Sequence, residues 1–454
     1  MEAMRLRGKL SRILAVGLVS IAAGAWQPPR NPGLPSAAEI NGILKELSDI
    51  TGFAIHRELP FASVTRDQVN GYLKEQIRET VKPQEIQAEE VSLKMLGFVP
   101  DDFDLKQTTI DLLTEQAAAF YDFHRRKLFI SDWATVNMRD EALIHELAHA
   151  LADQNFPIRK FMESHSDDSE ISLAREAVVE GQASWLMLEV TARRNGKTLA
   201  DPQTARQLLE LDTASADNEY PVFGKAPLYL RRTLLFPYDA GQRFQQAVFE
   251  RDGKAGFSRV FRDPPVSSAQ IDFPERYFAH EDPKPPTLPK LAKGAREFVA
   301  GTLGELETHI LLEQYVNEAF ADTLSPHLKG GVYRIEEDPK THRRTLFYIS
   351  EWDDEDSASR FFAAYQDVLR GKSKTIDVAS RSDEDITGKT EKGYFAVTRT
   401  AKQVVVREGY VAAFGAQKSA AIVPQFREQP DDFQIQPHQR DHQAEGAVPF
   451  HIFR

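Results

Sequence analysis

The segment HELAH carries two imidazoles, those of His145 and His149, four residues apart, and the carboxylate of Glu146 lies between them in the chain. Side chains four residues apart lie on one face of a helix, so both imidazoles can bind a single zinc ion. Glu146 would then lie beside the metal, where its carboxylate can accept a proton from water that the ion has made acidic. This HExxH pattern predicts a hydrolytic zinc site with Glu146 as the general base.

The residues around this motif predict the helix that it requires. Positions 140–153 contain helix-forming residues and neither Gly nor Pro. Three leucines at four-residue intervals would bury one stripe of the helix and leave the histidines on another face: Leu143, Leu147 and Leu151. The alternative is a core helix whose histidines are only hydrogen-bonded, but that alternative gives no reason for burying Glu146.

A catalytic zinc ion needs a third protein ligand, and a second acidic helix supplies candidates. Within residues 174–185, Glu176 and Glu180 are four apart and can face the same site. We assign the ligand to Glu180, because small residues next to it would let this helix approach the HExxH helix closely: Gly181, Ala183 and Ser184. Glu176 would either support the metal ligands or face solvent as a charge beside Arg175.

Four further residues are candidates for supporting roles. Asp153 follows His149 by one turn and can orient an imidazole or a neighbouring basic side chain. A phenol can stabilise the oxyanion that forms during hydrolysis, and three tyrosines are candidates: Tyr220, Tyr229 and Tyr238. Packing is the alternative role for each of these tyrosines.

These motifs resemble those of a known family. An HExxH helix followed by a helical glutamate is similar to the gluzincin metallopeptidases, and EGQAS at 180–184 looks like the EGxAS element that carries the third ligand in their aminopeptidases. HELAHALADQNF with the later VEGQA also resembles a group of poorly characterised bacterial secreted proteins that read HELxHALxDQxF and VEGDA. The resemblance extends to four more segments and so covers most of the mature chain: 115–122, 264–268, 273–277 and 301–306.

The resemblance implies a zinc-dependent peptidase with a zincin-like fold, one Zn²⁺ per chain, and a peptide or protein as substrate. The chain departs from the family's pattern at three positions. Relatives tend to have an acidic residue where Gln182 stands, a glycine where Ala119 stands and a histidine where Phe273 stands. If that histidine stabilises the oxyanion in relatives, its replacement would weaken catalysis in this chain.

Composition excludes several other classes of function. With 454 residues, 41% hydrophobic and 27% charged, the chain can form sizeable apolar cores and is not a disordered protein. Its formal net charge of -12 and the lack of a dense basic patch argue against a nucleic-acid partner. The absence of cysteine excludes disulfides, a thiolate zinc site and lipid attachment through an N-terminal cysteine.

The N-terminal residues have the pattern of an export signal. Basic residues up to Arg12 precede an apolar stretch at 13–23 and a small-residue site, AGA, at 23–25. We therefore predict a signal peptide at 1–25 and an exported protein, periplasmic or extracellular. The alternative is a retained segment that anchors the chain in the membrane. Residues 26–35, rich in proline, would form an extended linker.

The rest of the chain predicts an α+β protein with two folded domains. The first, at 36–300, would be a helix-rich, zincin-like metallopeptidase domain with a small sheet at its edge. Before the HExxH motif, its patterns predict helices at 36–50 and 65–81, a short strand at 56–61, and a hairpin of 118–121 with 127–131. The hairpin is either a wall that binds an extended peptide through main-chain hydrogen bonds or a plain structural element.

A smaller α+β domain at 301–424 would follow, and a polar tail at 425–454 would end the chain. Amphipathic and alternating segments predict the elements of this domain: helices at 303–321 and 354–369, and strands at 331–336, 345–350, 393–398 and 403–408. Its Trp352 and phenylalanines are expected in the core of the domain.

Two functions from different classes fit these patterns. The first is an exported zinc peptidase that hydrolyses peptide bonds by Glu146-assisted attack of water. The second is a catalytically inactive module that keeps the peptidase scaffold and binds a partner in the periplasm or outside the cell. Hydrolysis of a non-peptide bond is a further alternative, because activated water is not specific for amides.

Overall fold

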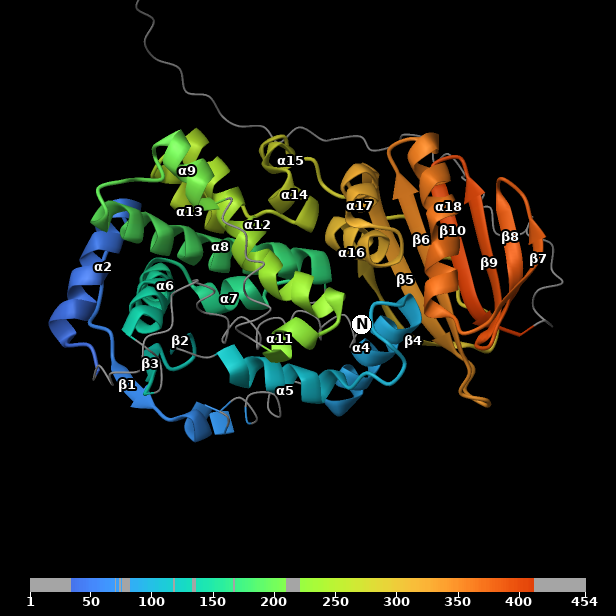
Figure 1. Cartoon of the computed structure of the whole chain (residues 1–454), viewed down its shortest axis with the longest axis horizontal. Coiled ribbons are helices and arrows are strands. Elements are labelled where there is room, and N and C mark those ends of the chain that lie inside the picture. Colours follow the sequence, from blue (N-terminus) through green and yellow to red (C-terminus); the bar gives the residue numbers. More distant parts are fainter. Residues whose placement is uncertain are drawn as a thin grey trace, which may run out of the picture. The chain divides into compact units, whose positions relative to one another are not determined.

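The computed structural model describes residues 34–411, apart from 70, 73–74, 76–81, 117–118, 133–135, 166–167 and 210–220, and apart from the side chains of 113–116 and 136–138. Several predictions fall outside the described residues: the signal peptide at 1–25, most of the linker at 26–35, much of the helix at 65–81, Tyr220, and the tail at 425–454. The described chain is an α+β structure with a helical region, a three-stranded sheet and a separate seven-stranded sheet (Figure 1).

The helical region is organised around three helices. α6 (Val136–Asn155) carries the HExxH motif, α8 (Ser169–Arg194) carries the acidic segment, and α12 (Leu228–Asp252) packs along α8. The predicted helix at 36–50 is confirmed as α2 (Ala37–Thr51), which Ser36 begins with a capping box. The other helices of this region whose bounds the structure describes are α4 (Pro83–Leu96), α5 (Leu105–Gln116), α7 (Ile158–Glu163), α9 (Pro202–Leu209), α11 (Pro221–Lys225), α13 (Ala255–Arg262), α14 (Ser268–Asp272) and α15 (Pro274–Phe278).

The three-stranded sheet lies beside α6. Its strands are β1 (Phe61–Val64), β2 (Ala119–Asp122) and β3 (Lys127–Ser131), in the order β1-β3-β2. The predicted hairpin is confirmed, because β2 and β3 pair antiparallel, and both contact α6. The strand predicted at 56–61 is wrong in its position, since β1 begins only at Phe61. The amides of His56 and Arg57 donate instead to the side chain of Gln154 near the end of α6.

Two glycines bring the backbones of α8 and α12 into direct contact. A Cβ atom added to Gly181 would lie 2.1 Å from the carbonyl carbon of Gly241, and one added to Gly241 would lie 2.3 Å from the carbonyl oxygen of Ala177. The helices run in the same direction, because one turn after Gly181 the Trp185 indole donates to Gln246. The prediction that Gly181 allows close approach to the HExxH helix is wrong, since Gly181 faces α12.

The larger sheet contains seven strands: β4 (Arg296–Leu303), β5 (Leu328–Glu337), β6 (Arg344–Trp352), β7 (Ile376–Arg381), β8 (Asp385–Thr390), β9 (Gly393–Thr400) and β10 (Gln403–Tyr410). Their order is β4-β5-β6-β10-β9-β8-β7, and all neighbours are antiparallel. α18 (Glu355–Lys372) packs on β6, β9 and β10 (Figure 1). The four predicted strands and the predicted helix at 354–369 are confirmed, whereas β4, β7 and β8 were not predicted.

The helix predicted at 303–321 is wrong in its bounds. Leu303 ends β4, and two helices follow, α16 (Glu305–Tyr315) and α17 (Glu318–Leu324), with the 3-10 turn η2 (Ser325–His327) after them. Asn317 explains the break, because its side chain accepts a hydrogen bond from the Phe320 amide and so caps α17.

Apolar side chains from the helical region and from the seven-stranded sheet belong to one core cluster. Phe244 of α12 shares this cluster with Ile335 of β5 and Tyr348 of β6. β4 begins at Arg296 and therefore crosses the domain boundary predicted after residue 300. The division into two domains stays a prediction. A second cluster lies among α2, α6 and the three-stranded sheet. None of the described helices combines the length and the apolar character needed to cross a membrane.

Candidate metal centre

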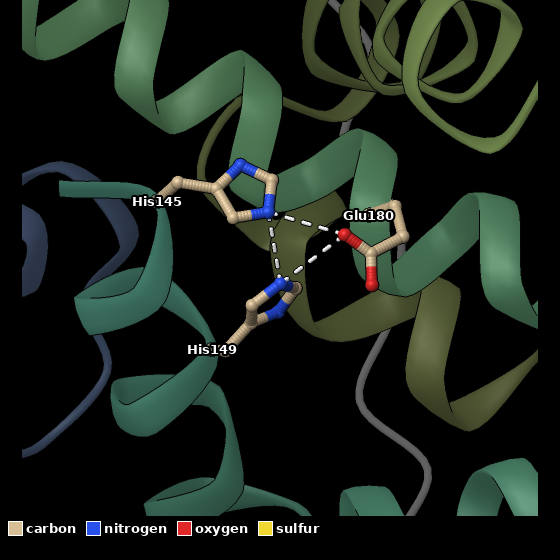
Figure 2. A group of neighbouring side chains, drawn as sticks. All are labelled: His145, His149 and Glu180. Atoms are coloured by element: carbon tan, nitrogen blue, oxygen red, sulfur yellow. Dashed lines mark hydrogen bonds and ion pairs between the residues drawn. The ribbon is translucent and has the colours of Figure 1, made fainter. Parts of the chain in front are cut away.

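Three buried side chains from α6 and α8 converge on one point (Figure 2). Nε2 of His145 lies 3.0 Å from Nε2 of His149 and 3.1 Å from Oε2 of Glu180. The third distance, from Nε2 of His149 to Oε2 of Glu180, is 3.3 Å. The exposed fractions of His145, His149 and Glu180 are 2%, 4% and 2%. The three residues predicted as metal ligands therefore meet in the folded chain.

The separations of these three atoms fit a zinc ion. Zinc binds nitrogen and oxygen ligands at about 2.0–2.2 Å in a tetrahedron, which places neighbouring ligand atoms roughly 3.3 Å apart. The observed separations run from 3.0 Å to 3.3 Å. Two imidazoles and one carboxylate are also a donor set that suits zinc and leaves a fourth position for water or substrate. The cluster is therefore suited to hold a zinc ion.

Local structure fixes the position of each ligand. In α6, the predicted apolar stripe is buried, with Leu147 and Leu151 each 0% exposed, and it packs into the cluster shared with α2 and the small sheet. The two histidines follow each other by one turn on another face of α6, toward α8. α8 presents Glu180 to them from the opposite side, as Figure 2 shows.

Burial and neighbouring charges set the protonation of the cluster. Burial alone would raise the pKa of Glu180, but His149 and His145 outweigh burial and lower that pKa to about 2. Burial lowers the pKa of His145, although Glu180 opposes this change. Burial would lower the pKa of His149, but Glu180 and Glu146 outweigh burial and raise this pKa. The lowered pKa values of Glu180 and His145 favour the ionised carboxylate and the neutral imidazole, which are the forms that bind a metal ion.

Glu146 lies beside the cluster and is 4% exposed. Its Oε2 atom accepts a hydrogen bond of 2.7 Å from the backbone amide of Tyr121 on β2. Burial raises the pKa of Glu146 to about 8; Glu180 adds to this rise, and His149 and the Tyr121 amide oppose it. The carboxyl group is therefore held in place by the small sheet and can exchange a proton near neutral pH.

Tyr238 is the candidate phenol that the structure places at the cluster. Its ring stacks against that of His145, with centroids 5.9 Å apart, and its hydroxyl is hydrogen-bonded to Glu180. Burial, and then the charges of Glu180, Glu176 and Glu146, raise the pKa of Tyr238 well above its usual range. The phenol therefore stays protonated and can donate a hydrogen bond.

The structure places Tyr229 away from the cluster, although it is on the same helix as Tyr238. Its ring packs against Phe98 at a centroid distance of 4.6 Å, and it lines a cavity toward the start of α12. Tyr220 lies outside the described residues. The geometry thus favours Tyr238 over Tyr229 as a hydrogen-bond donor at the site.

Asp153 is buried but orients groups other than the imidazoles. It accepts a hydrogen bond of 3.0 Å from the Tyr121 hydroxyl and lies 3.5 Å from Arg57 and 3.6 Å from Arg126. Of the two roles predicted for Asp153, the structure therefore favours the orientation of neighbouring basic side chains. Because Tyr121 also donates its amide to Glu146, Asp153 helps to fix the strand that holds Glu146.

The prediction of a solvent-facing Glu176 is wrong, because this side chain is only 3% exposed. Glu176 precedes Glu180 by one turn on α8, and its charge contributes to the raised pKa of Tyr238. Arg175, which was expected beside it at the surface, is 8% exposed and donates to the carbonyl oxygens of Phe161 and Ser164. Glu176 therefore belongs to the buried surroundings of the metal cluster.

The three departures from the family's pattern serve packing. Gln182 donates to Gln245 and to the carbonyl oxygen of Phe257, so its amide joins α8 to α12 and α13. Phe273 lies between α14 and α15, beneath the guanidinium of Arg276 at 4.8 Å. Ala119 begins β2 and is 1% exposed. Among the described contacts, none joins these three residues to the metal cluster.

Two aromatic residues of the hairpin contribute to the site and were not predicted. Tyr121 holds Glu146 through its amide and Asp153 through its hydroxyl. Phe123 packs its ring edge against His149, with centroids 5.7 Å apart. The only sequence signal for them was the position of the hairpin just before the HExxH helix, because both contacts depend on tertiary packing.

Comparisons with protein-family models, with curated proteins and with solved structures found no match to this chain. The interpretation of the site therefore depends on its own geometry and on the motifs in the sequence.

Proposed function

We propose that the chain is a zinc-dependent peptidase of the gluzincin type, with a zincin-like fold in its helical region. His145, His149 and Glu180 would hold one Zn²⁺ per chain. The observation that carries this proposal is the convergence of three buried ligands beside the carboxylate of Glu146. When bound there, zinc would supply a Lewis acid that polarises the scissile carbonyl and makes water acidic.

Glu146 carries out the proton transfers in the proposed reaction. The Tyr121 amide holds one carboxylate oxygen, which leaves the other oxygen to take a proton from the attacking water. Glu146 then gives this proton to the amide nitrogen that leaves. A nearby cation favours the ionised carboxylate, so Glu146 would act as a base at a lower pH than its pKa of about 8 indicates.

Two other features would act on the substrate. The protonated hydroxyl of Tyr238 is hydrogen-bonded to Glu180; when it turns from Glu180 to the substrate, it would donate its one hydrogen to the oxyanion that forms from the scissile carbonyl. β2 is an outer strand of its sheet, but its residues are buried and its Tyr121 amide already donates to Glu146, so an extended peptide would pair only with the main-chain groups that β2 leaves free. The N-terminal pattern supports export to the periplasm or the cell exterior, with a membrane contact only if the signal segment is retained.

The metal assignment is tested by elemental analysis of purified protein. The wild-type chain should contain about one zinc ion, and Glu180→Gln should lose most of it, because a carboxylate ligand is removed. Glu176→Gln is the matched control, since Glu176 is equally buried one turn earlier on α8 and should retain zinc. Zinc retained in Glu180→Gln and lost from Glu176→Gln would show that the wrong glutamate is assigned.

The catalytic assignment is tested with Glu146→Gln. This change keeps the size of the side chain and its hydrogen bond from Tyr121 but removes the base, so zinc content and fold should be unchanged. Hydrolysis should fall by roughly 10²–10⁴-fold. Wild type and variant are compared on an unstructured peptide library, with zinc measured in the same samples. If zinc-loaded wild type cleaves no better than Glu146→Gln, the inactive binding module replaces the peptidase as the explanation of the site.

A further inference from the structure

A cavity of about 290 Å³ lies at one end of the seven-stranded sheet. Three parts of the chain line it: residues 292–295 just before β4, the turn that joins β5 to β6 with the neighbouring ends of these strands, and the end of β10. Phe347 of β6 and Arg407 of β10 are partners in the strand register, and both belong to its lining. All of these residues lie in or beside the sheet, so the cavity is separate from the metal cluster on α6 and α8.

Arg407 lies on the face of the sheet opposite α18. The next residue, Glu408, accepts a hydrogen bond of 2.7 Å from the Tyr365 hydroxyl of α18. Successive side chains of a strand point to opposite faces, so Arg407 points away from α18. Its side chain therefore reaches the cavity instead of the core between α18 and the sheet.

Two aromatic rings hold the guanidinium of Arg407 in place. Its central carbon lies 4.9 Å from the ring centroid of Phe347 and 4.9 Å from that of Tyr410. These cation–π contacts engage the positive charge, but they use none of the N–H donors that lie in the plane of the guanidinium. Arg407 is therefore fixed in position and still needs hydrogen-bond acceptors.

No described residue supplies an acceptor to Arg407. Its Nε atom is buried and makes no hydrogen bond, and none of the described carboxylates forms an ion pair with its guanidinium. Buried polar groups nearly always have a partner, and a charge withdrawn from water without one is costly. An oxyanion in the cavity would provide this acceptor, because a guanidinium binds carboxylates through two parallel hydrogen bonds.

The charges around the cavity also favour an anion. Two carboxylates line it, and both accept hydrogen bonds from within the protein: Glu336 accepts at 2.6 Å and 3.1 Å from Arg334, and Asp338 accepts from two backbone amides of its own turn. Four cationic side chains are among the described residues of the lining: Lys293, Lys340, Arg343 and Arg407. The described lining therefore carries more positive than negative charge.

We propose that this cavity binds the carboxylate of an organic acid whose remaining part is apolar. The carboxylate pairs with Arg407, and the apolar part lies against small and apolar lining residues: Ala292, Ala295, Pro339 and Val411. A carboxylate is favoured over a phosphate dianion, because Glu336 and Asp338 repel a second negative charge. Such a carboxylate belongs to the C-terminus of a peptide or to a fatty acid, and in either case its binding is independent of the proposed peptidase activity.

Isothermal titration calorimetry with small acids tests the cavity. Hexanoate and hexanamide have the same alkyl chain, and only hexanoate carries a carboxylate. The wild-type chain should bind hexanoate at least about tenfold more tightly, because the amide cannot form hydrogen bonds between charged groups. Nα-acetyl-leucine represents the C-terminus of a peptide, so whichever of hexanoate and Nα-acetyl-leucine binds more tightly identifies the source of the carboxylate. Inorganic phosphate bound more tightly than both acids would overturn the choice of a carboxylate.

Arg407→Lys is the decisive variant. It keeps the positive charge but loses the planar pair of donors, so hexanoate should bind at least about tenfold more weakly. Arg399→Lys is the matched control and should bind hexanoate like wild type, because Arg399 lies on the neighbouring strand β9, pairs with Glu384 at 3.7 Å and is not among the described residues that line the cavity. Lys340→Gln combined with Arg343→Gln removes two cations from an exposed turn and should weaken binding severalfold. This double variant keeps the test available if thermal unfolding shows that Arg407→Lys is not folded.

The variants also locate the bound acid. A carboxylate that bound at the metal cluster instead would bind equally to wild type and Arg407→Lys, because this variant leaves His145, His149 and Glu180 unchanged. Equal binding of this kind overturns the cavity proposal, as does equal binding of hexanoate and hexanamide by the wild-type chain. Preferential binding of hexanoate that is lost in Arg407→Lys and kept in Arg399→Lys supports the proposal, whatever the zinc content and the peptidase activity of the chain are.

Discussion

Replacing Gly181 with alanine tests whether the contact between α8 and α12 is required for stability and for the metal cluster. The added Cβ atom would lie 2.1 Å from the carbonyl carbon of Gly241 and 2.4 Å from its Cα and carbonyl oxygen. These are backbone atoms, so no side chain can rotate away to make room. The two helices must instead move apart by on the order of 1 Å to reach ordinary contact distances.

Two opposing effects determine the free energy of unfolding of Gly181→Ala. Alanine is favoured over glycine inside a helix by about 1 kcal/mol. Overpacking costs about 1–3 kcal/mol, and contact with rigid backbone places this substitution at the upper end of that range. We therefore expect a net loss of about 2 kcal/mol. Because α8 carries Glu180 and α12 carries Tyr238, separation of the helices should also weaken zinc binding.

Urea denaturation followed by circular dichroism measures this loss, and Gly42→Ala is the matched control. Gly42 lies on the exposed side of α2, and a Cβ atom there would meet nothing within 4 Å. Gly42→Ala should therefore gain up to about 1 kcal/mol from helix propensity alone. If Gly181→Ala proves as stable as Gly42→Ala and retains its zinc, the reasoning from the close helix contact is refuted.

Two further changes have measurable outcomes. Tyr238→Phe should retain zinc and lower kcat by roughly 10²-fold, because an oxyanion donor is lost; an unchanged kcat would exclude the phenol from catalysis. Burial would raise the pKa of Glu337, but hydrogen bonds from Arg296, His342 and Arg344 lower it to about 2. The stability from this lowered pKa is present above the ordinary value of 4.5 and is lost as the pH falls from there toward 2. The urea concentration at the midpoint of unfolding should therefore fall less for Glu337→Gln than for wild type in that pH window. An equal fall in the two proteins would contradict the proposed stabilisation by ionised Glu337.

The convergence of His145, His149 and Glu180 could be predicted because it depends in part on local periodicity. The four-residue interval between His145 and His149 fixes their common face in any regular helix, whatever surrounds it. Glu176 and Glu180 were both candidates because of a similar interval, and Glu180 was chosen for the small residues beside it, of which Gly181 faces α12 instead of α6. Gly181 brings α8 close to α12, and nothing in the sequence indicated that α12 would lie on that side of α8.

Features that depend on pairing between distant segments could not be predicted. Tyr121 lies 25 positions before Glu146, and the hydrogen bond between them exists only because β2 packs beside α6. The edge strand β7 is exposed at nearly every position, so it lacks the apolar alternation by which β5, β6, β9 and β10 were found. The break between α16 and α17 did have a sequence signal, because Asn317 is a common N-cap residue, but the apolar pattern around it concealed the boundary.

The hydrogen bond from the Tyr121 amide to Glu146 has a consequence for how the site tolerates mutation. Because the donor is a main-chain group, no substitution at position 121 other than proline can delete it. The side chain at this position can therefore vary during evolution while the carboxylate keeps its orientation, provided that the strand stays in place. The orientation of Glu146 depends instead on the position of the whole hairpin, so small alterations in the packing between β2 and α6 should affect it more than the identity of residue 121 does.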